Sequence, residues 1–381
     1  MKKWLLLIIS WVVLHSPCSA GGYQELAVLP TGDSLFRQDN SVGIMFHGPR
    51  AVLSTSIING GYRNDLAGVY NHTITSSMGM TVADYVGYMG QQSAALGLDL
   101  QKVSCMGTAA SMDNVAVRTE RFREASVTAI VTAGIEGNAG RAGDPADYFQ
   151  PGQKPGSLKP GTINIMVMID ADLADATLAQ ALVTCTEAKT AALQELMVGS
   201  RYSQGLATGT GTDQTILVAN PQSGLYLDDA GKHSKLGELI GRSVKEAVKE
   251  ALEKQNGLSG QKQLSVTRRL ERFGLTWDKL YKRNGELYPS VTKADFFRSY
   301  EVLDRDERLV AAASLYAHLL DQFAWGLLPT AAVRDTGNEL LAAMARHRSV
   351  AIKQIQGDSL EEFISAWEDF LLRCLQNHEK V

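Results

Sequence analysis

The stretch that most constrains this chain is a run of small and hydroxyl-bearing residues near the middle of the sequence. It reads Ala-Thr-Gly-Thr-Gly-Thr-Asp over residues 207–213 and leads into the apolar, β-rich segment 214–219. The pattern predicts a tight loop that feeds a strand. Glycine lets a backbone approach a ligand closely, and successive N–H groups in such a loop can hold an anion or a developing oxyanion. A polar turn between a helix and a strand is the simpler interpretation. A P-loop is excluded because the Gly-Lys-Ser/Thr ending is missing.

The composition is that of a globular protein with room for one large domain or two modest ones. The 381 residues are 45% hydrophobic and 20% charged, and the formal net charge is −4. A small negative net charge gives no general affinity for nucleic acid, so nucleic acid is not an expected partner.

The first twenty residues have the pattern of a secretory signal peptide. A positively charged start is followed by an apolar run over residues 4–14 and by small residues up to Ala20. The apolar run is too short for a transmembrane helix, so no stable membrane span is expected. The residues before Cys18 do not match a lipoprotein signal. We therefore predict an exported, periplasmic protein whose mature chain begins near Gly21.

Cleavage after residue 20 would leave three cysteines, Cys105, Cys185 and Cys374. Their spacing fits neither a disulfide framework nor a zinc motif, and at most one bridge could form. We expect mostly buried thiols.

Hydrophobic patterns predict a mixed α/β fold, of α+β character, for the first part of the chain. Strands are predicted at residues 42–46, 52–58, 126–133 and 162–169. Helices are predicted at residues 80–95, from about 172 or 175 to 197, and at residues 231–252. Ser234 is the expected N-cap of the last of these helices. Residues 71–73 are predicted to lie in a polar loop.

The composition changes after Gly260, where glycine becomes rare and arginine, glutamate, leucine and tryptophan increase. Helices are predicted at residues 265–283, 294–326, 336–355 and 358–378. The chain is thus divided into a signal peptide (1–20), a catalytic domain (21–258) and an all-α C-terminal region of unknown role (262–381). Because the polar motifs end by about residue 252, we expect the C-terminal helices to be dispensable for chemistry.

Two charged side chains and one histidine stand out from the helical patterns. Lys189 falls within the apolar stripe of the helix that ends at residue 197, and Glu187 falls on the opposite face. A lysine in such a stripe needs a partner or a function, unless it reaches solvent at the rim. His233 precedes a helix start, where backbone N–H groups lower the proton affinity of an imidazole and favour a neutral base. A lone histidine at such a place is more often a surface residue.

Four polar clusters follow strands or precede helices. They lie at residues 59–61, 132–144, 208–213 and 232–234. In α/β folds the ends of strands and the starts of helices gather into one site. We therefore expect the four clusters to converge.

The clusters belong to an ordered set of motifs that extends from about residue 40 to residue 255. The set comprises Leu-Ser-Thr-Ser-Ile-Ile-Asn-Gly-Gly (53–61), Thr-Ala-Gly (132–134) with Asn-Ala (138–139), Gly-Thr-Ile-Asn-Ile (161–165), Thr-Glu-Ala-Lys-Thr (186–190), Ala-Thr-Gly-Thr-Gly-Thr-Asp (207–213) and Gly-Lys-His-Ser-Lys-Leu-Gly (231–237). It closely resembles the adenosylcobinamide amidohydrolase family of corrinoid salvage. The resemblance implies hydrolysis of the amide that joins cobyric acid to its aminopropanol arm. An insertion-like Glu136-Gly137, the signal peptide and the helical C-terminal region depart from the family pattern, and they leave the cellular setting and the preferred corrinoid open.

Amide hydrolysis needs a nucleophile, a base, donors for the oxyanion and an acid for the leaving amine. The candidate catalytic residues are Asp213 or His233 as base, Thr208 or Thr210 as nucleophile, and Lys189 and Glu187 as positioning groups. An activated water is an equally good nucleophile. The candidate substrate-binding residues are Asn59, Gly60, Gly61, Asn138, Asn164, Gly209, Gly211 and Thr212. The backbone of residues 209–212 would serve the oxyanion, and the asparagines suit an amide-rimmed corrin.

The histidines and cysteines show no metal-ligand spacing, so hydrolysis without a metal or other cofactor is expected. The corrinoid cobalt would belong to the substrate. One alternative is an exported, non-catalytic corrinoid-binding protein that feeds a transporter, with corrinoid transport components as its partners. The other is an amidase that acts on cell-wall or peptide amides. We expect alanine at Asp213 or His233 to cost little stability, because both positions are predicted at exposed ends of elements.

Overall fold

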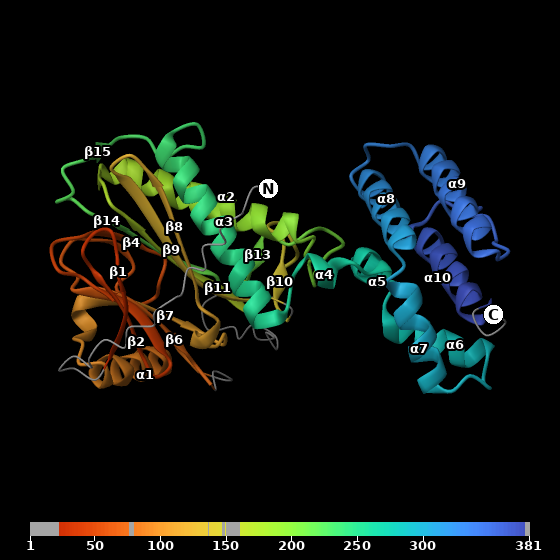
Figure 1. Ribbon diagram of the computed structural model, residues 1–381, viewed down its shortest axis with the longest axis horizontal. Helices are drawn as coiled ribbons and strands as arrows, with labels where there is room; N and C mark the ends of the chain where they lie inside the picture. Colours follow the sequence, from red (N-terminus) through yellow and green to blue (C-terminus); the bar gives the residue numbers. More distant parts are fainter. Residues whose placement is uncertain (1–22, 76–79, 136, 147–148, 150–160, 378–381) are drawn as a thin grey trace, which may run out of the picture.

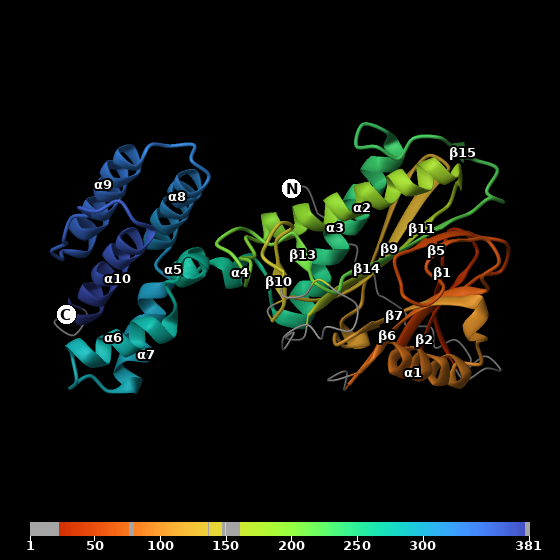
Figure 2. The ribbon, with the colours of Figure 1, turned by 180° about the vertical axis from the view of Figure 1, so that it is seen from behind.

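The structure is a computed structural model, and it describes residues 23–75, 80–135, 137–146, 149 and 161–377. Figure 1 shows a part built of sheets and helices, followed along the chain by a separate group of helices, and Figure 2 shows the same parts from behind. The short helix α4 (Gly260–Gln263) lies where the two parts meet.

Two sheets form the centre of the first part. The first sheet has the strand order β1 (Gln24–Val28), β2 (Ser34–Gln38), β3 (Ser41–Met45), β6 (Gly68–Thr73) and β7 (Val103–Thr108). The second sheet has the order β5 (Gly61–Arg63), β4 (Ala51–Ser54), β14 (Gln214–Ala219), β11 (Thr162–Ile169), β9 (Ala125–Gly134) and β8 (Ala116–Phe122). The pairs β6–β7 and β11–β14 are parallel, and the other neighbours are antiparallel.

Three apolar layers show how the elements stack. Val52, Ile130 and Met166 belong to a cluster that fills the space between the two sheets. A second cluster joins the other face of the second sheet to α2 (Asp175–Glu195) and α3 (Lys235–Asn256). A third joins the first sheet to α1 (Val82–Ala95). The result is a helix–sheet–sheet–helix arrangement. It explains why β11 is apolar along almost its whole length, since both of its faces are covered.

The C-terminal helices have a core of their own. They are α5 (Val266–Leu270), α6 (Trp277–Leu287), α7 (Lys293–Asp304), α8 (Glu307–Ala324), α9 (Thr330–Arg348) and α10 (Leu360–Asn377). Tyr316, Trp367 and Phe370 are fully buried in a cluster drawn from these helices. The predicted fold class, a mixed α/β part followed by an all-α region, is confirmed.

Several predicted boundaries are corrected by the structure. The helix predicted at 294–326 is divided before α8, where the Asp306 side chain accepts the N–H groups of Arg308 and Leu309. The helix predicted at 265–283 is interrupted at Gly274, whose φ is +97°. Residues 71–73, predicted as a loop, form the end of strand β6.

The prediction that Ser234 is the N-cap of α3 is confirmed, since its hydroxyl accepts the Gly237 N–H at 3.0 Å. The strand predicted at 52–58 is β4, which ends at Ser54 and is followed by a turn.

Among the residues that the structure describes, no helix combines the length and the hydropathy needed to cross a membrane.

Cys105, Cys185 and Cys374 are free and buried, as predicted. Burial raises the pKa of each of the three thiols to about 12, so that they stay protonated at neutral pH. We predict that a thiol reagent leaves all three unlabelled for minutes at pH 8 in the folded chain lacking residues 1–20. All three should react when the chain is unfolded in guanidinium chloride. Rapid labelling of the folded protein would contradict the burial of these thiols.

Candidate active site

Three of the four predicted polar clusters lie at one end of the second sheet, along the edge where the central strands β14 and β11 begin. Asn164 near the start of β11 pairs with Gln214 on one side and with Thr132 on the other. Ser54 at the end of β4 pairs with Ile216. Because β4 and β9 run antiparallel to β14 and β11, their ends meet the starts of the central strands. Residues 59–61, 132–135, 137–144 and 208–213 are thereby gathered at this edge.

The fourth cluster lies at the opposite end of the sheet. The start of α3 is beside the turn between β8 and β9, where the Lys235 ammonium is 4.7 Å from the centre of the Phe122 ring. The end of α3 reaches the edge described above, where the Asn256 side chain accepts the Ile135 N–H at 3.3 Å. Strand β11, which is 8 residues long, spans roughly 25 Å between these ends.

The expectation that all four clusters converge is therefore wrong for residues 232–234. The physical reason is the direction of β14, which carries the chain away from residue 213 before α3 begins. His233 is exposed at the far end, and the structure does not bring it to Asp213. Glu187 is also at the surface, where its carboxylate pairs with the Lys232 ammonium at 2.6 Å.

The Asp213 carboxylate is the centre of the site. Its Oδ1 accepts the Ile163 N–H at 2.8 Å and the Thr210 hydroxyl at 2.6 Å. Its Oδ2 accepts the Thr210 N–H at 2.9 Å and the Lys189 ammonium at 2.6 Å. A carboxylate offers about four acceptor positions, so these donors occupy all of them. The Thr210 hydroxyl is the one donor of the four that could also serve as a nucleophile.

Lys189, which sequence analysis placed in a buried stripe without a partner, pairs with Asp213. The two side chains are only 12% and 10% exposed. Gly209 makes room for this ion pair, since a Cβ atom at that position would lie 2.4 Å from Asp213 Oδ2 and 2.8 Å from Lys189 Nζ. The second glycine of the loop, Gly211, is exposed beside the Asn138 side chain. The first glycine is therefore required by the packing of the charged pair.

The three threonines of the loop have different surroundings. Thr210 bonds to Asp213, whereas Thr208 Oγ1 accepts the Ala142 N–H at 2.9 Å and so faces the neighbouring turn. The Thr212 hydroxyl donates to the Gly161 carbonyl at 3.0 Å. The N–H groups of Thr210 and Thr212 bond inside the loop, to Asp213 and to the Thr210 hydroxyl. These two N–H groups are thus engaged within the loop, and they are not free to serve an oxyanion in this conformation.

The candidate asparagines use their amides to hold the protein together. Asn59 donates to the carbonyls of Leu100 and Val103 at 2.6 Å each. The turn that follows needs glycine, because a Cβ at Gly60 would lie 2.1 Å from the Ser56 carbonyl oxygen and the φ of Gly61 is +82°. Asn59, Gly60 and Gly61 therefore shape the end of β4.

Asn138 and Asn164 are each 1% exposed. Asn138 donates to the Gly161 carbonyl at 3.2 Å and accepts the Tyr202 hydroxyl at 2.9 Å. Asn164 donates to Asn71 Oδ1 at 2.9 Å. Both amides thus support the edge at which Asp213 lies.

Sequence reasoning missed the residues that support the site from a distance. The Asn71 amide donates to the Thr132 hydroxyl at 2.7 Å, so that Asn71, Thr132 and Asn164 link the two sheets through buried hydrogen bonds. Next to Asn71, His72 contacts the hydroxyls of Ser41 and Tyr88 at 2.8 and 2.9 Å. Burial lowers the pKa of His72, which favours its neutral form. The neighbouring polar residues at 71–73 suggested a loop, and no local pattern revealed their partners.

In the described ranges, no group of three or more His, Cys, Asp or Glu side chains is close enough to hold a metal ion.

The fold and this edge define a mixed α/β protein in which an aspartate and a threonine of a glycine-rich loop meet a lysine of helix α2. A family model described as adenosylcobinamide amidohydrolase matches residues 26–260, and the chain belongs to that family. An uncharacterized protein of Methanocaldococcus jannaschii is 38% identical over 235 residues, which are 59% of this chain and 90% of that protein.

Two solved structures were also matched, each covering 61% of this chain and 83% of the other chain. One is the PH0078 protein from Pyrococcus horikoshii, which is 12% identical with a TM-score of 0.28. The other is an L-aminopeptidase D-Ala-esterase/amidase from Ochrobactrum anthropi, which is 14% identical with a TM-score of 0.28.

Because the Lys189–Asp213 pair is mostly buried, a substitution of Asp213 should change the stability of the protein more than the sequence predicted. Asp213→Asn leaves a mostly buried ammonium without its counter-charge, and breaking such a pair costs about 3–5 kcal/mol. We therefore expect a large loss of unfolding free energy in a urea titration, not the small one predicted from sequence. Glu187→Gln is the matched control, since its partner is exposed and the loss should stay within about 0.5 kcal/mol. Equal losses in the two variants would show that the Lys189–Asp213 pair contributes no more than a surface pair.

Proposed function

We propose that this protein hydrolyses the amide bond that links cobyric acid to aminopropanol in adenosylcobinamide. Family membership carries the proposal, and the matched span of residues 26–260 contains the whole Lys189–Asp213–Thr210 cluster. Water would supply the hydroxyl of the new carboxylic acid and the proton of the released amine. The products would be adenosylcobyric acid and aminopropanol.

Thr210 is the nucleophile that the geometry favours. Its hydroxyl already donates to Asp213 at 2.6 Å, which is the arrangement of a nucleophile and its base. An attacking water would have to displace one of the four donors from the Asp213 carboxylate before it could be deprotonated there. Lys189 holds the second carboxylate oxygen and keeps the first one directed at Thr210.

In the proposed first step, the Thr210 oxygen bonds to the amide carbon and its proton passes to Asp213. The carbon–nitrogen bond then breaks, and the aminopropanol nitrogen takes that proton. In the second step a water molecule hydrolyses the threonine ester, so that the carboxylic acid leaves and the Thr210 hydroxyl is restored. His233 and Glu187 take no part in this scheme because they lie away from the loop. No metal or other cofactor is needed, and the cobalt belongs to the substrate.

We also propose an exported, periplasmic setting in which the enzyme acts on scavenged corrinoids beside corrinoid transport components. The support is the charged, apolar and small-residue order of residues 1–20, which lie outside the described residues. The proposed organisation is a signal peptide (1–20), a catalytic domain (21–258) and a helical region (262–381).

The purified chain lacking residues 1–20 should convert adenosylcobinamide to adenosylcobyric acid without added metal, as followed by chromatography of the corrinoids. Thr210→Val should lower kcat by about 100- to 10,000-fold, because it removes the hydroxyl that Asp213 would deprotonate. Thr208→Val is the matched control and should keep most of the activity, since that hydroxyl faces Ala142.

Four other outcomes of the same experiment would contradict the proposed function or its mechanism. Tight cobinamide binding without turnover would identify a corrinoid-binding protein. Hydrolysis of peptide amides that cobinamide does not inhibit would identify a different amidase. Activity that a chelator abolishes and one metal restores would overturn the metal-free scheme. Full activity of Thr210→Val would favour an activated water.

Intact-mass spectrometry of the protein from its native host tests the export proposal. We expect a chain that begins near Gly21 and is found in the periplasmic fraction. A full-length chain in the cytoplasm would refute export.

A further inference from the structure

Arg272 is a buried arginine of the C-terminal helical region that reaches toward the α/β part. It lies in the short 3-10 helix Glu271–Phe273 and holds Asp321 of α8 through two hydrogen bonds of 2.6 Å each. The two side chains are 4% and 10% exposed. A two-point arginine–carboxylate contact fixes the plane of the guanidinium group. The arginine is therefore held in a defined orientation by the helices around it.

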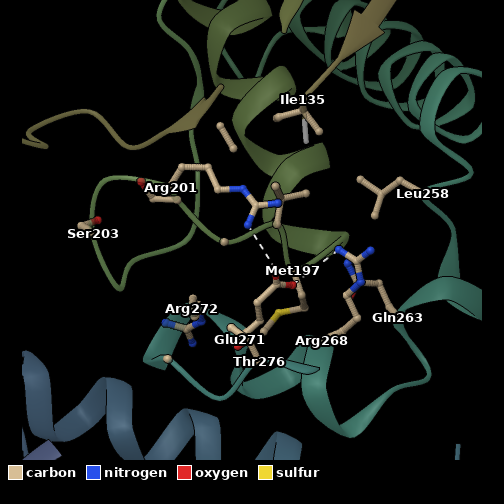
Figure 3. A pocket seen from close by; sticks show the side chains of 15 residues that line it. Ile135, Met197, Arg201, Ser203, Leu258, Gln263, Arg268, Glu271, Arg272 and Thr276 are labelled. Atoms are coloured by element: carbon tan, nitrogen blue, oxygen red, sulfur yellow. Dashed lines mark hydrogen bonds and ion pairs between the residues drawn. The ribbon is translucent and has the colours of Figure 1, made fainter. Parts of the chain in front are cut away.

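The same guanidinium group contacts the loop formed by residues 197–207. Arg272 Nη1 donates to the Gln204 carbonyl at 2.5 Å. A Cβ atom at Gly199 would lie only 3.0 Å from Arg272 Cβ, so the loop backbone packs directly on this side chain. Glu271 adds an ion pair with Arg201 at 3.1 Å. Figure 3 shows Arg272, Glu271, Arg201 and Ser203 among the residues that line a cavity next to this contact. The cavity has a volume of about 280 Å³.

The 197–207 loop continues this contact to the candidate active site. The Tyr202 hydroxyl donates to Asn138, whose amide donates to the Gly161 carbonyl. The Thr212 hydroxyl donates to the same carbonyl at 3.0 Å. Arg272 is thus connected to the residue that precedes Asp213, first through the loop backbone between Gln204 and Tyr202 and then through the hydrogen bonds of Asn138 and Gly161.

A second connection runs through Asp144. Its carboxylate accepts the Ser200 hydroxyl at 2.5 Å and the Arg141 N–H at 2.8 Å. Burial acts to raise the pKa of Asp144, but hydrogen bonds from Ser200, Ser203 and the Arg141 N–H, together with the Arg141 charge, lower the pKa overall. The ionised carboxylate ties the 197–207 loop to the turn that donates the Ala142 N–H to Thr208.

We propose that the C-terminal helices position the active-site loop through Arg272, with Tyr202 and Asn138 as the connecting residues. These three are positioning residues, because none of them contacts the Asp213 carboxylate in the structure. The role of the helices is then to hold the 197–207 loop, which contradicts the expectation that they are dispensable for chemistry. A displacement of about 1 Å that originates far from the reacting atoms can lower the rate by about 100-fold. The activity part of this inference rests on the proposed amide hydrolysis.

The test is a double-mutant cycle with Arg272→Leu and Tyr202→Phe in the full mature chain. Each single variant should lower kcat for adenosylcobinamide by about 10- to 100-fold and change KM by less than about 3-fold. Because both act on one chain of contacts, the double variant should be little worse than the worse single one. Arg334→Leu is the control, since Arg334 pairs with Asp358 inside the C-terminal helical region and away from the 197–207 loop, and its kcat should equal that of the wild type.

Hydrogen exchange gives a readout that does not depend on activity. Both variants should speed amide exchange in a peptide covering residues 209–213, and Arg334→Leu should not. Hydrogen exchange can be measured even if the wild type does not hydrolyse adenosylcobinamide. A failure of the proposed function is therefore distinguished from a failure of the positioning role. Tyr202→Phe removes one hydroxyl from a half-exposed side chain, so it decides the question if Arg272→Leu does not fold. The proposal would be overturned if the exchange rates at residues 209–213 were unchanged in both variants. It would also be overturned if the fold-loss of kcat in the double variant equalled the product of the losses in the two single variants.

Discussion

The candidate active site depends on one carboxylate whose acceptor positions are all filled. Asp213 binds a backbone N–H of β11, the N–H and hydroxyl of Thr210, and the ammonium of Lys189 on α2. Burying an ion pair is expensive unless its polar atoms are hydrogen-bonded, and here the remaining acceptor positions of Asp213 are filled by Thr210 and by the Ile163 N–H. The same contacts that stabilise the charge also fix the loop, so the stability of this edge and its chemistry cannot be separated.

Local patterns in the sequence predicted the structure correctly where contacts between near neighbours in the chain determine it. The apolar run Thr162–Ile169 is strand β11 with those bounds, and Ser234 caps α3 as its position predicted. Lys189 in an apolar stripe correctly indicated a partner, although the partner itself was not predicted. Such features follow from periodicity, capping and the cost of burying a charge, and these act over a few residues.

The remaining features depend on contacts that no local pattern contains. Asn71 is in a strand because its backbone pairs with β3 and β7, and its amide meets Asn164, 93 residues later in the chain. His233 has the composition of a site residue, but the direction of β14 puts it at the wrong end of the sheet. Arg272 looks like one more charged residue in a helical region, and its contact with the Gln204 carbonyl exists only once the two parts of the chain have met.

The pairing of β4 with β14 has a consequence for the order of folding. Thr55 and Thr215 exchange hydrogen bonds across a separation of 160 residues, only two residues beyond Asp213. Closing so long a loop is entropically costly and slow, whereas the hairpin of β8 and β9 and the helices form from nearby segments. We therefore expect the pairing of β4 with β14 to form later than these local elements. A nascent chain on the ribosome cannot form its polar site until residue 215 has been synthesised, because the site needs both members of this distant pair.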